Sequence, residues 1–277
     1  MPYYEESKPL FGKVVRIILF DIDVQLAKEL INDAYEEGLR LQKIFNYYDS
    51  TSELSLLNRK RSLKVSNELL FVINKAISIN RFVPEYNICL GKVLEERKNG
   101  HKTDYIPSMK RIRIDGNKVQ FTDSIAKIDL GSIAKGYIVD KMIEMLRLNG
   151  VKSGLIEARG DILCFGNHIN VIQIQHPRES NTQIMSIRVK NMAVATSGDY
   201  NQYYGSYETS HIINSQELIS VTTVGSNLME ADVLATALFV ATEEKELIRK
   251  FKSYSFLTID HNLKLRYYNG FSKMVVS

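Results

Sequence analysis

The stretch SVTTVGSNLMEADVLATALFVA, residues 220–241, predicts a strand, a polar turn and then a helix of small apolar residues. Within that helix Asp232 and Thr236 stand one turn apart, so both side chains project from the same face. Burying a carboxylate on an otherwise apolar helix is costly unless something pairs with it. Two interpretations stay open. Asp232 caps the start of the helix, which leaves Thr236 without a special role, or the pair faces a ligand.

Outward from this stretch, strands outnumber helices and often follow one another with no helix between them. This pattern favours an α+β fold of mixed or antiparallel sheets with packed helices over a doubly wound sheet. No repeat, low-complexity segment or linker divides the chain, so a single domain is expected over residues 1–277. The predicted strands, rich in β-branched residues, are 12–20, 111–121 as a hairpin around Asp115 and Gly116, 127–130, 154–166, 169–175, 184–198, 218–225, 255–260 and 263–268.

The predicted helices are marked by apolar positions at helical spacing and by capping residues. A long one covers 24–45, and Ser52 is suited to cap a short helical turn. Another begins after Ser66 or Asn67 and must end before Pro84. Further helices are expected between Gly131 and Gly150, over 229–241 and over 243–252.

Composition excludes several classes of protein. The chain has 277 residues, 44% hydrophobic and 25% charged, and its net charge of +4 is spread along the sequence, which does not favour a nucleic-acid partner. Cys89 and Cys164 have neither metal-ligand spacing nor a disulfide framework. No apolar run approaches the roughly 20 residues of a membrane span, and the first ten residues lack the features of a secretory signal. A cytoplasmic location is therefore expected.

Residues 129–140, DLGSIAKGYIVD, form the second informative stretch. Gly131 permits an unusual turn, and the helix after it is expected to present free N–H groups and the positive end of its dipole. Lys135 falls in the first turn, where a cation is unfavourable unless an anion is near, and a phosphate is the natural one. The alternative is a solvent-facing lysine. The spacing is not that of a phosphate-binding loop with a GxxxxGK[ST] pattern.

A third stretch, residues 195–214, adds a turn at Thr196–Gly198 and a lone histidine, His211. Lone histidines are more often structural than catalytic. A lysine at a helix start, an acid–hydroxyl pair suited to a hard cation, and a histidine are together compatible with a site for Mg²⁺ and phosphate, since Mg²⁺ prefers oxygen ligands and shares its shell with substrate phosphates.

The same stretches, in the same order, resemble the ApbE family of FAD:protein FMN transferases. DLGSIAKGYIVD resembles that family's DLGGIAKGYAVD, and EADVLATALFVA (230–241) resembles its EADALATALFVLG. VATSGDYNQYY and the following SHII resemble TSGDYRxYF and SHIIDP. LIEARGDILCFG, QHPRE, YDSTSELSLLN and PLFGKVVRI also have counterparts, so the resemblance covers about residues 10–245.

The resemblance implies a reaction in which Mg²⁺ assists cleavage of the FAD pyrophosphate, FMN moves to a threonine of an acceptor flavoprotein, and AMP is released. It implies His211 as general base or phosphate stabiliser and Asp232 as the second catalytic residue. The implied metal ligands are Asp232, Thr236, the carbonyl of Ser132 and the adjacent Ala235. The implied flavin contacts are Phe11, Tyr48, Glu85, Tyr86, Asn87, Asp129, Lys135 and Ile213.

The chain also departs from the family pattern, mainly on the flavin and acceptor side. YNIC (86–89) stands where the family has FDPT, Arg159-Gly160 replaces Gly-Gly, and the short NSQEL (214–218) replaces a DPRTG loop. Two alternatives to the transferase therefore remain, an FAD pyrophosphatase that yields FMN and AMP, and an FAD-binding protein without turnover.

Overall fold

A computed structural model describes residues 2–101, 105–179, 181–200, 203–204, 206–210 and 217–276. Its centre is an eight-stranded sheet in the order β1-β2-β6-β7-β10-β13-β14-β15, and every neighbouring pair is antiparallel. The strands are β1 (Tyr3–Leu10), β2 (Lys13–Phe20), β6 (Gly154–Ala158), β7 (Asp161–Phe165), β10 (Ala193–Gly198), β13 (Leu218–Gly225), β14 (Ser255–Asp260) and β15 (Leu265–Tyr268).

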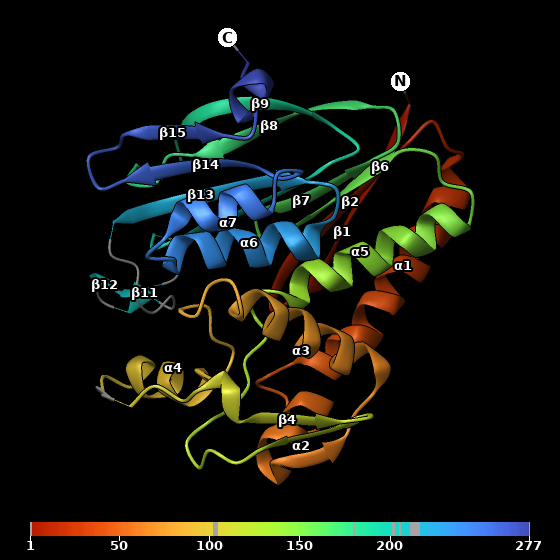
Figure 1. Cartoon of the computed structure of the whole chain (residues 1–277). Coiled ribbons are helices and arrows are strands. Elements are labelled where there is room, and N and C mark those ends of the chain that lie inside the picture. The colour runs from red at the N-terminus through yellow and green to blue at the C-terminus, as the bar shows by residue number, and fades with distance from the viewer. Residues whose placement is uncertain are drawn as a thin grey trace.

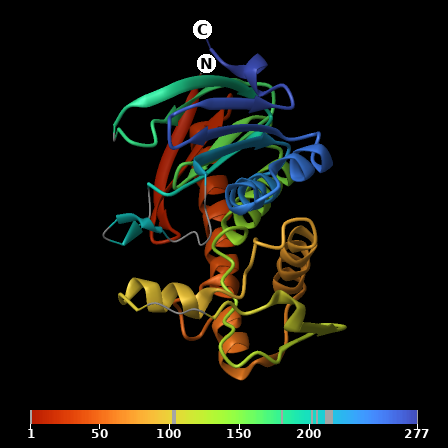
Figure 2. The ribbon, with the colours of Figure 1, turned by 60° about the vertical axis from the view of Figure 1, so that its left-hand side comes forward.

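Helices cover one face of this sheet, and a further group of elements lies below it (Figure 1). The helices are α1 (Val24–Phe45), α2 (Glu53–Lys60), α3 (Asn67–Asn80), α4 (Gly91–Lys98), α5 (Ala134–Leu148), α6 (Leu228–Val240) and α7 (Glu244–Lys250), with short 3₁₀ turns at Met109–Arg111 and Phe271–Met274. Three smaller sheets comprise β3 (Ser62–Lys64), β5 (Lys118–Phe121) and β4 (Ile112–Asp115), the pair β8 (Ile169–Gln175) and β9 (Gln183–Lys190), and the pair β11 (Tyr203–Tyr204) and β12 (Ser206–Ser210). Figure 2 shows α3, α4 and the β4–β5 hairpin grouped beneath the sheet, with α1 extending down to them.

The large sheet separates two hydrophobic cores, because successive side chains of a strand point to opposite faces. On β7, Leu163 and Phe165 lie in the larger core beneath the helices, while Cys164 between them lies in the smaller core. The β8–β9 hairpin covers that smaller core through residues such as Ile174 and Ile187. Strand β13 lies inside the sheet between β10 and β14, and all eight of its residues are buried.

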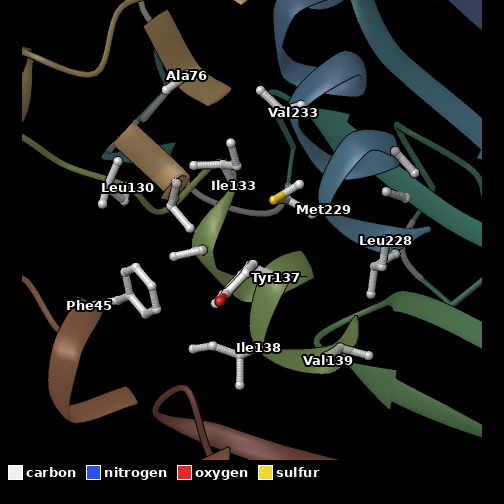
Figure 3. Close-up of a cluster of buried hydrophobic side chains, with 14 of the residues drawn as sticks. Phe45, Ala76, Leu130, Ile133, Tyr137, Ile138, Val139, Leu228, Met229 and Val233 are labelled. Atoms are coloured by element: carbon white, nitrogen blue, oxygen red, sulfur yellow. The ribbon is translucent and has the colours of Figure 1, made fainter. Parts of the chain in front are cut away.

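Helices α5 and α6 meet closely at their N-terminal ends. A Cβ at Gly136 would lie 2.5 Å from the carbonyl oxygen of Leu228, so only glycine allows this approach. Figure 3 shows Tyr137 of α5 and Phe45 of α1 pointing toward one another. Their ring centroids are 5.6 Å apart at 72°, an edge-to-face arrangement.

The predicted α+β class and most predicted elements are confirmed. Ser52 and Ser66 cap α2 and α3, and the hairpins at 112–121 and 255–268 form as expected. The strand expected at 127–130 is wrong, because Lys127 makes only an isolated bridge to Leu90. Strand β1 and helix α4 were not expected from the sequence. In the described part of the chain, no helix combines the length and apolarity that crossing a membrane requires.

Candidate active site

The first turn of α5 and the middle of α6 bring Lys135 and Asp232 together. The Lys135 ammonium contacts the Asp161 carboxylate at the start of β7 and lies 3.3 Å from Asp232 Oδ2. All three side chains are largely buried, with 18%, 5% and 8% of the lysine, Asp161 and Asp232 side chains exposed. Lys135 is therefore not the solvent-facing lysine of the alternative interpretation, and it already has anionic partners within the protein.

Asp161 was missed by sequence reasoning, which gave it no role and placed it only within the predicted strand region 154–166. It follows the tight Arg159–Gly160 turn, in which both residues have positive φ (58° and 93°). Its Oδ1 accepts a hydrogen bond of 3.0 Å from the backbone N–H of Thr196 on β10, while Oδ2 contacts Lys135. Only the pairing of strands far apart in sequence brings these groups together, so no local pattern could have indicated them.

Asp232 does not cap α6. The cap is Asn227, whose side chain accepts a 2.9 Å hydrogen bond from the N–H of Glu230. Asp140 of α5 supports the same end, accepting from the N–H groups of Leu228 and Met229 at 2.7 and 2.9 Å. The capping interpretation is therefore wrong. Although Lys135 lies within ion-pair distance, Asp232 Oδ2 is buried without a hydrogen-bonding partner.

Thr236 lies one turn after Asp232, and its hydroxyl is 2.9 Å from the hydroxyl of Ser197 on β10. Strand β10 thus contacts both parts of the site, since the preceding residue, Thr196, holds Asp161. Ala235, an implied neighbour of the metal ligands, is fully buried on α6. Its methyl group has no ligand atom, so any contribution to a site would come from its backbone.

The loop before α5 adds Ser132 and Asp129. The hydroxyl of Ser132 lies 2.9 Å from the phenol oxygen of Tyr86. Burial raises the pKa of Tyr86, and the carboxylates of Asp232 and Asp129 raise it further, so the phenol stays protonated beside both acids. Burial also raises the pKa of Asp129, against the opposing hydrogen bond from the N–H of Gly131 at 2.7 Å.

The turn before α5 differs in two respects from what the sequence suggests. Gly131 is not among the residues with positive φ, so the turn at this position does not use the backbone freedom that glycine permits. Several N–H groups expected to be free are already bonded: Gly131 donates to Asp129, and both Ile133 and Ala134 donate to the carbonyl of Leu130. The positive character of the site therefore depends on the Lys135 side chain more than on exposed backbone donors.

Glu85, Asn87, Phe11 and Tyr48, which are expected to contact the flavin, interact with protein groups elsewhere in the fold. Glu85 accepts a hydrogen bond of 2.5 Å from the Thr242 hydroxyl. Asn87 donates to the carbonyl of Pro107 at 2.7 Å and accepts from the N–H of Cys89 at 2.8 Å, so it serves as a turn residue. Phe11, at the β1–β2 turn, donates its N–H to Gln42 at 2.7 Å.

Tyr48 is 77% exposed, and its ring lies 5.4 Å from that of Tyr47 and 5.7 Å from the ammonium of Lys98. The structure thus gathers Lys135, Asp232, Thr236, Ser132, Tyr86 and Asp129 around the start of α5. None of the partners named above for Phe11, Tyr48, Glu85 and Asn87 belongs to that group. The predicted residues His211 and Ile213 lie outside the described residues.

The oxygen atoms in this site suit a hard cation better than a soft one. Among the described residues, no cluster of three or more His, Cys, Asp or Glu side chains could hold a metal by itself. A carboxylate with an unbonded buried oxygen and a nearby hydroxyl nevertheless match the sparse protein share that Mg²⁺ usually has when substrate phosphates complete its shell. Asp232 and Thr236 could therefore hold such an ion.

Comparisons with known proteins show which sequences and folds this chain resembles. The sequence profile of the ApbE family matches residues 11–256. A FAD:protein FMN transferase from Vibrio cholerae is 30% identical over 230 residues, and the match covers 72% of this chain and 69% of that protein. A FAD:protein FMN transferase from Haemophilus influenzae is 28% identical over 238 residues, with the same two coverages.

Solved structures share the fold. The ApbE protein from Thermotoga maritima superposes with a TM-score of 0.85 at 23% identity over the full length of both chains. The flavin transferase ApbE from Vibrio cholerae gives a TM-score of 0.81 at 23% identity over 99% of each chain. At this identity the likeness concerns the fold alone, whereas the profile match extends over most of the sequence. This chain therefore belongs to the ApbE family.

Proposed function

We propose that this protein transfers the FMN moiety of FAD to a threonine of an acceptor flavoprotein, with Mg²⁺ as the required cation and AMP as the leaving product. Family membership and the names of the relatives from Vibrio cholerae and Haemophilus influenzae support the reaction class. Mg²⁺ and the threonine rest on the resemblance of the motifs and on the chemistry of the site.

The observation that carries the proposal is the buried meeting of Lys135 and Asp232 where α5 and α6 converge. A lysine at a helix start favours phosphate, and a carboxylate next to it favours a cation. An enzyme that cleaves a pyrophosphate needs both, because it must neutralise the charge on the phosphate oxygens and hold them in place.

Asp232 and Thr236, with the backbone of Ser132 and Ala235, would hold the Mg²⁺. When bound, Mg²⁺ supplies charge neutralisation at the pyrophosphate oxygens. Lys135 would bind the same phosphates from the helix start, and Tyr86 would keep Ser132 oriented through their 2.9 Å contact. His211 is proposed as the group that accepts a proton, by resemblance to the family motif.

In the transfer step, the threonine oxygen forms a bond to the phosphorus of the FMN half of FAD. The bond between that phosphorus and the bridging oxygen breaks, and the bridging oxygen leaves with AMP. The hydroxyl proton passes to the base. No oxidation or reduction takes place, so the flavin ring itself does not react.

The test incubates the protein with FAD, Mg²⁺ and an acceptor domain that carries its target threonine. We expect a fluorescent flavin on the acceptor in a denaturing gel and one AMP released for each flavin attached. Replacing the target threonine with alanine should remove the fluorescence. Asp232→Asn should lower the transfer rate by at least about 100-fold, since it removes the charge that holds the cation.

Glu230→Gln is the matched control, because Glu230 is an ion-paired acid on the same helix that faces Lys75 instead of the site. We expect it to keep near-normal transfer. FMN and AMP appearing at equal catalytic rates with or without the acceptor would identify a pyrophosphatase instead. FAD binding without any AMP would identify a binding protein, and either result would refute the transferase.

A further inference from the structure

Lys135 is shared by two carboxylates that differ in how they are held. Asp161 is fixed on both sides, by the Thr196 N–H at 3.0 Å and by the ammonium itself. Asp232 has the ammonium at 3.3 Å, and its Oδ2 lacks any hydrogen bond. The lysine is thus firmly attached to one acid and loosely associated with the other.

The charges make this arrangement incomplete. Two carboxylates and one ammonium leave a net charge of about −1 among largely buried side chains, which is costly without a further cation. A divalent ion bound by Asp232 would lie close to the Lys135 ammonium, and two cations repel one another strongly at such short range. The ammonium therefore competes with a divalent ion for Asp232.

We propose that Lys135 acts as an internal counter-ion for Asp232, which a divalent cation displaces, and that Asp161 is the positioning residue that retains the displaced lysine in the site. This rests on the proposed function in one respect, that Asp232 binds the cation. Once displaced, Lys135 stays on Asp161 with fewer anionic neighbours in the protein, which leaves its ammonium available to a phosphate.

The first test measures Mn²⁺ binding to the protein alone, without FAD, from the electron paramagnetic resonance signal of free Mn²⁺. Removing a competing cation should tighten binding, so we expect Lys135→Met to lower the Kd by about tenfold. Lys75→Met is the matched control, because Lys75 of α3 pairs with Glu230, which shares α6 with Asp232, and does not contact Asp232 itself. The Kd of this variant for Mn²⁺ should equal that of the wild type.

The role of Asp161 needs a double-mutant cycle. Asp161→Asn should weaken Mn²⁺ binding severalfold, because Lys135 then has Asp232 as its remaining carboxylate and holds it more tightly. If Asp161 acts through the lysine, the same substitution in the Lys135→Met background should change the Kd little. An equal loss in both backgrounds would mean that Asp161 acts on the ion directly, and would overturn its positioning role.

Lys135→Met leaves two carboxylates unpaired and can unfold the metal-free protein, so Lys135→Gln, which keeps a donor for Asp161, is the second variant. Circular dichroism confirms that each variant is folded before titration. If Asp232→Asn removes Mn²⁺ binding but neither lysine variant tightens it, the counter-ion proposal fails and the cation site stands. If Asp232→Asn leaves binding intact, Asp232 does not hold the ion, and both proposals fail at that point.

Discussion

At the scale of single residues, Asp140 links the site to pH. It supports the start of α6, the helix that carries Asp232 and Thr236, by accepting hydrogen bonds from the N–H groups of Leu228 and Met229. Burial raises the pKa of Asp140 from 3.8 to about 6, the two N–H groups oppose this, and the negative charges of Asp232 and Glu230 add to the rise. The folded protein therefore holds the Asp140 proton more tightly than the unfolded chain does.

This difference predicts how stability depends on pH. Between the unfolded pKa of 3.8 and the folded pKa of about 6, the free energy of unfolding should fall as pH rises, since the folded state must give up a proton that it binds better. Relative to Asp140→Asn, whose side chain does not titrate, the wild type should gain about 2 kcal/mol on going from pH 7 to pH 4.5. Denaturant unfolding of both proteins in a chelator measures this, and parallel pH profiles would contradict it.

At the scale of elements, the contact between α5 and α6 sets the distance between Lys135 and Asp232. Gly136 directly follows the lysine, and a Cβ there would lie 2.5 Å from the Leu228 carbonyl oxygen and 2.6 Å from the Met229 Cα. Backbone atoms cannot swing aside as the end of a side chain can. The two helices would have to move apart, and the site would widen with them.

Gly136→Ala is therefore expected to destabilise the protein by about 1–3 kcal/mol, although alanine alone favours a helix by roughly 1 kcal/mol over glycine. Gly38→Ala on α1 is the control. There the three atoms nearest to the new Cβ belong to the side chains of Leu10 and Met142, at 2.9–3.5 Å, and these side chains can shift. Denaturant unfolding compares the two. An equal or smaller loss for Gly136→Ala would show that the α5–α6 contact yields easily.

The predictability of these elements follows their local signals. The helices with capping serines and the hairpins with glycine turns are fixed by nearby residues, so Ser52, Ser66 and the Gly116 turn were read correctly. Strand β1 was missed because its YYEESKPL sequence is polar. It forms because every residue from Tyr3 to Leu10 pairs with β2. The false strand at 127–130 has one β-branched residue, Ile128, and among the described residues it makes only an isolated bridge between Lys127 and Leu90.

At the scale of the whole molecule, only some of the site residues could be predicted from the sequence. Lys135, Asp232 and Thr236 stand out because their chemistry is unusual for their helices. Asp161 and Ser197 do not, because their roles come from pairings across the sheet and between layers. For the same reason Asp232 could not be separated from a helix cap until Asn227 was seen in that place.

The two cores offer a test of whether the molecule unfolds as one unit. Cys89 lies in the core beneath the helices and Cys164 in the core beneath the β8–β9 hairpin. Burial raises the pKa of each thiol to about 12, and the charge of Asp123 adds to the rise at Cys89. At pH 8 both thiols should therefore resist a thiol reagent in the native state.

Because one sheet separates the two cores and contributes side chains to both, we expect both thiols to become reactive at the same denaturant concentration. Single variants Cys89→Ala and Cys164→Ala assign the two signals. The midpoint of each should match that of circular dichroism, as a single cooperative domain requires. A thiol that reacts well before the other would mean that one core opens independently, which would argue against one domain over the whole chain.

The gathering of Asp161, Lys135, Thr196 and Asp232 from four separate segments has a consequence for the lifetime of the protein. An unfolded chain cannot offer these groups together, so a ligand held among them binds only the folded form. At a concentration about 100 times its Kd, such a ligand adds roughly 2.7 kcal/mol to stability and makes unfolded chains about 100 times rarer. Because proteases cut opened chains, the molecules that survive longest in a cell would be those supplied with their substrate.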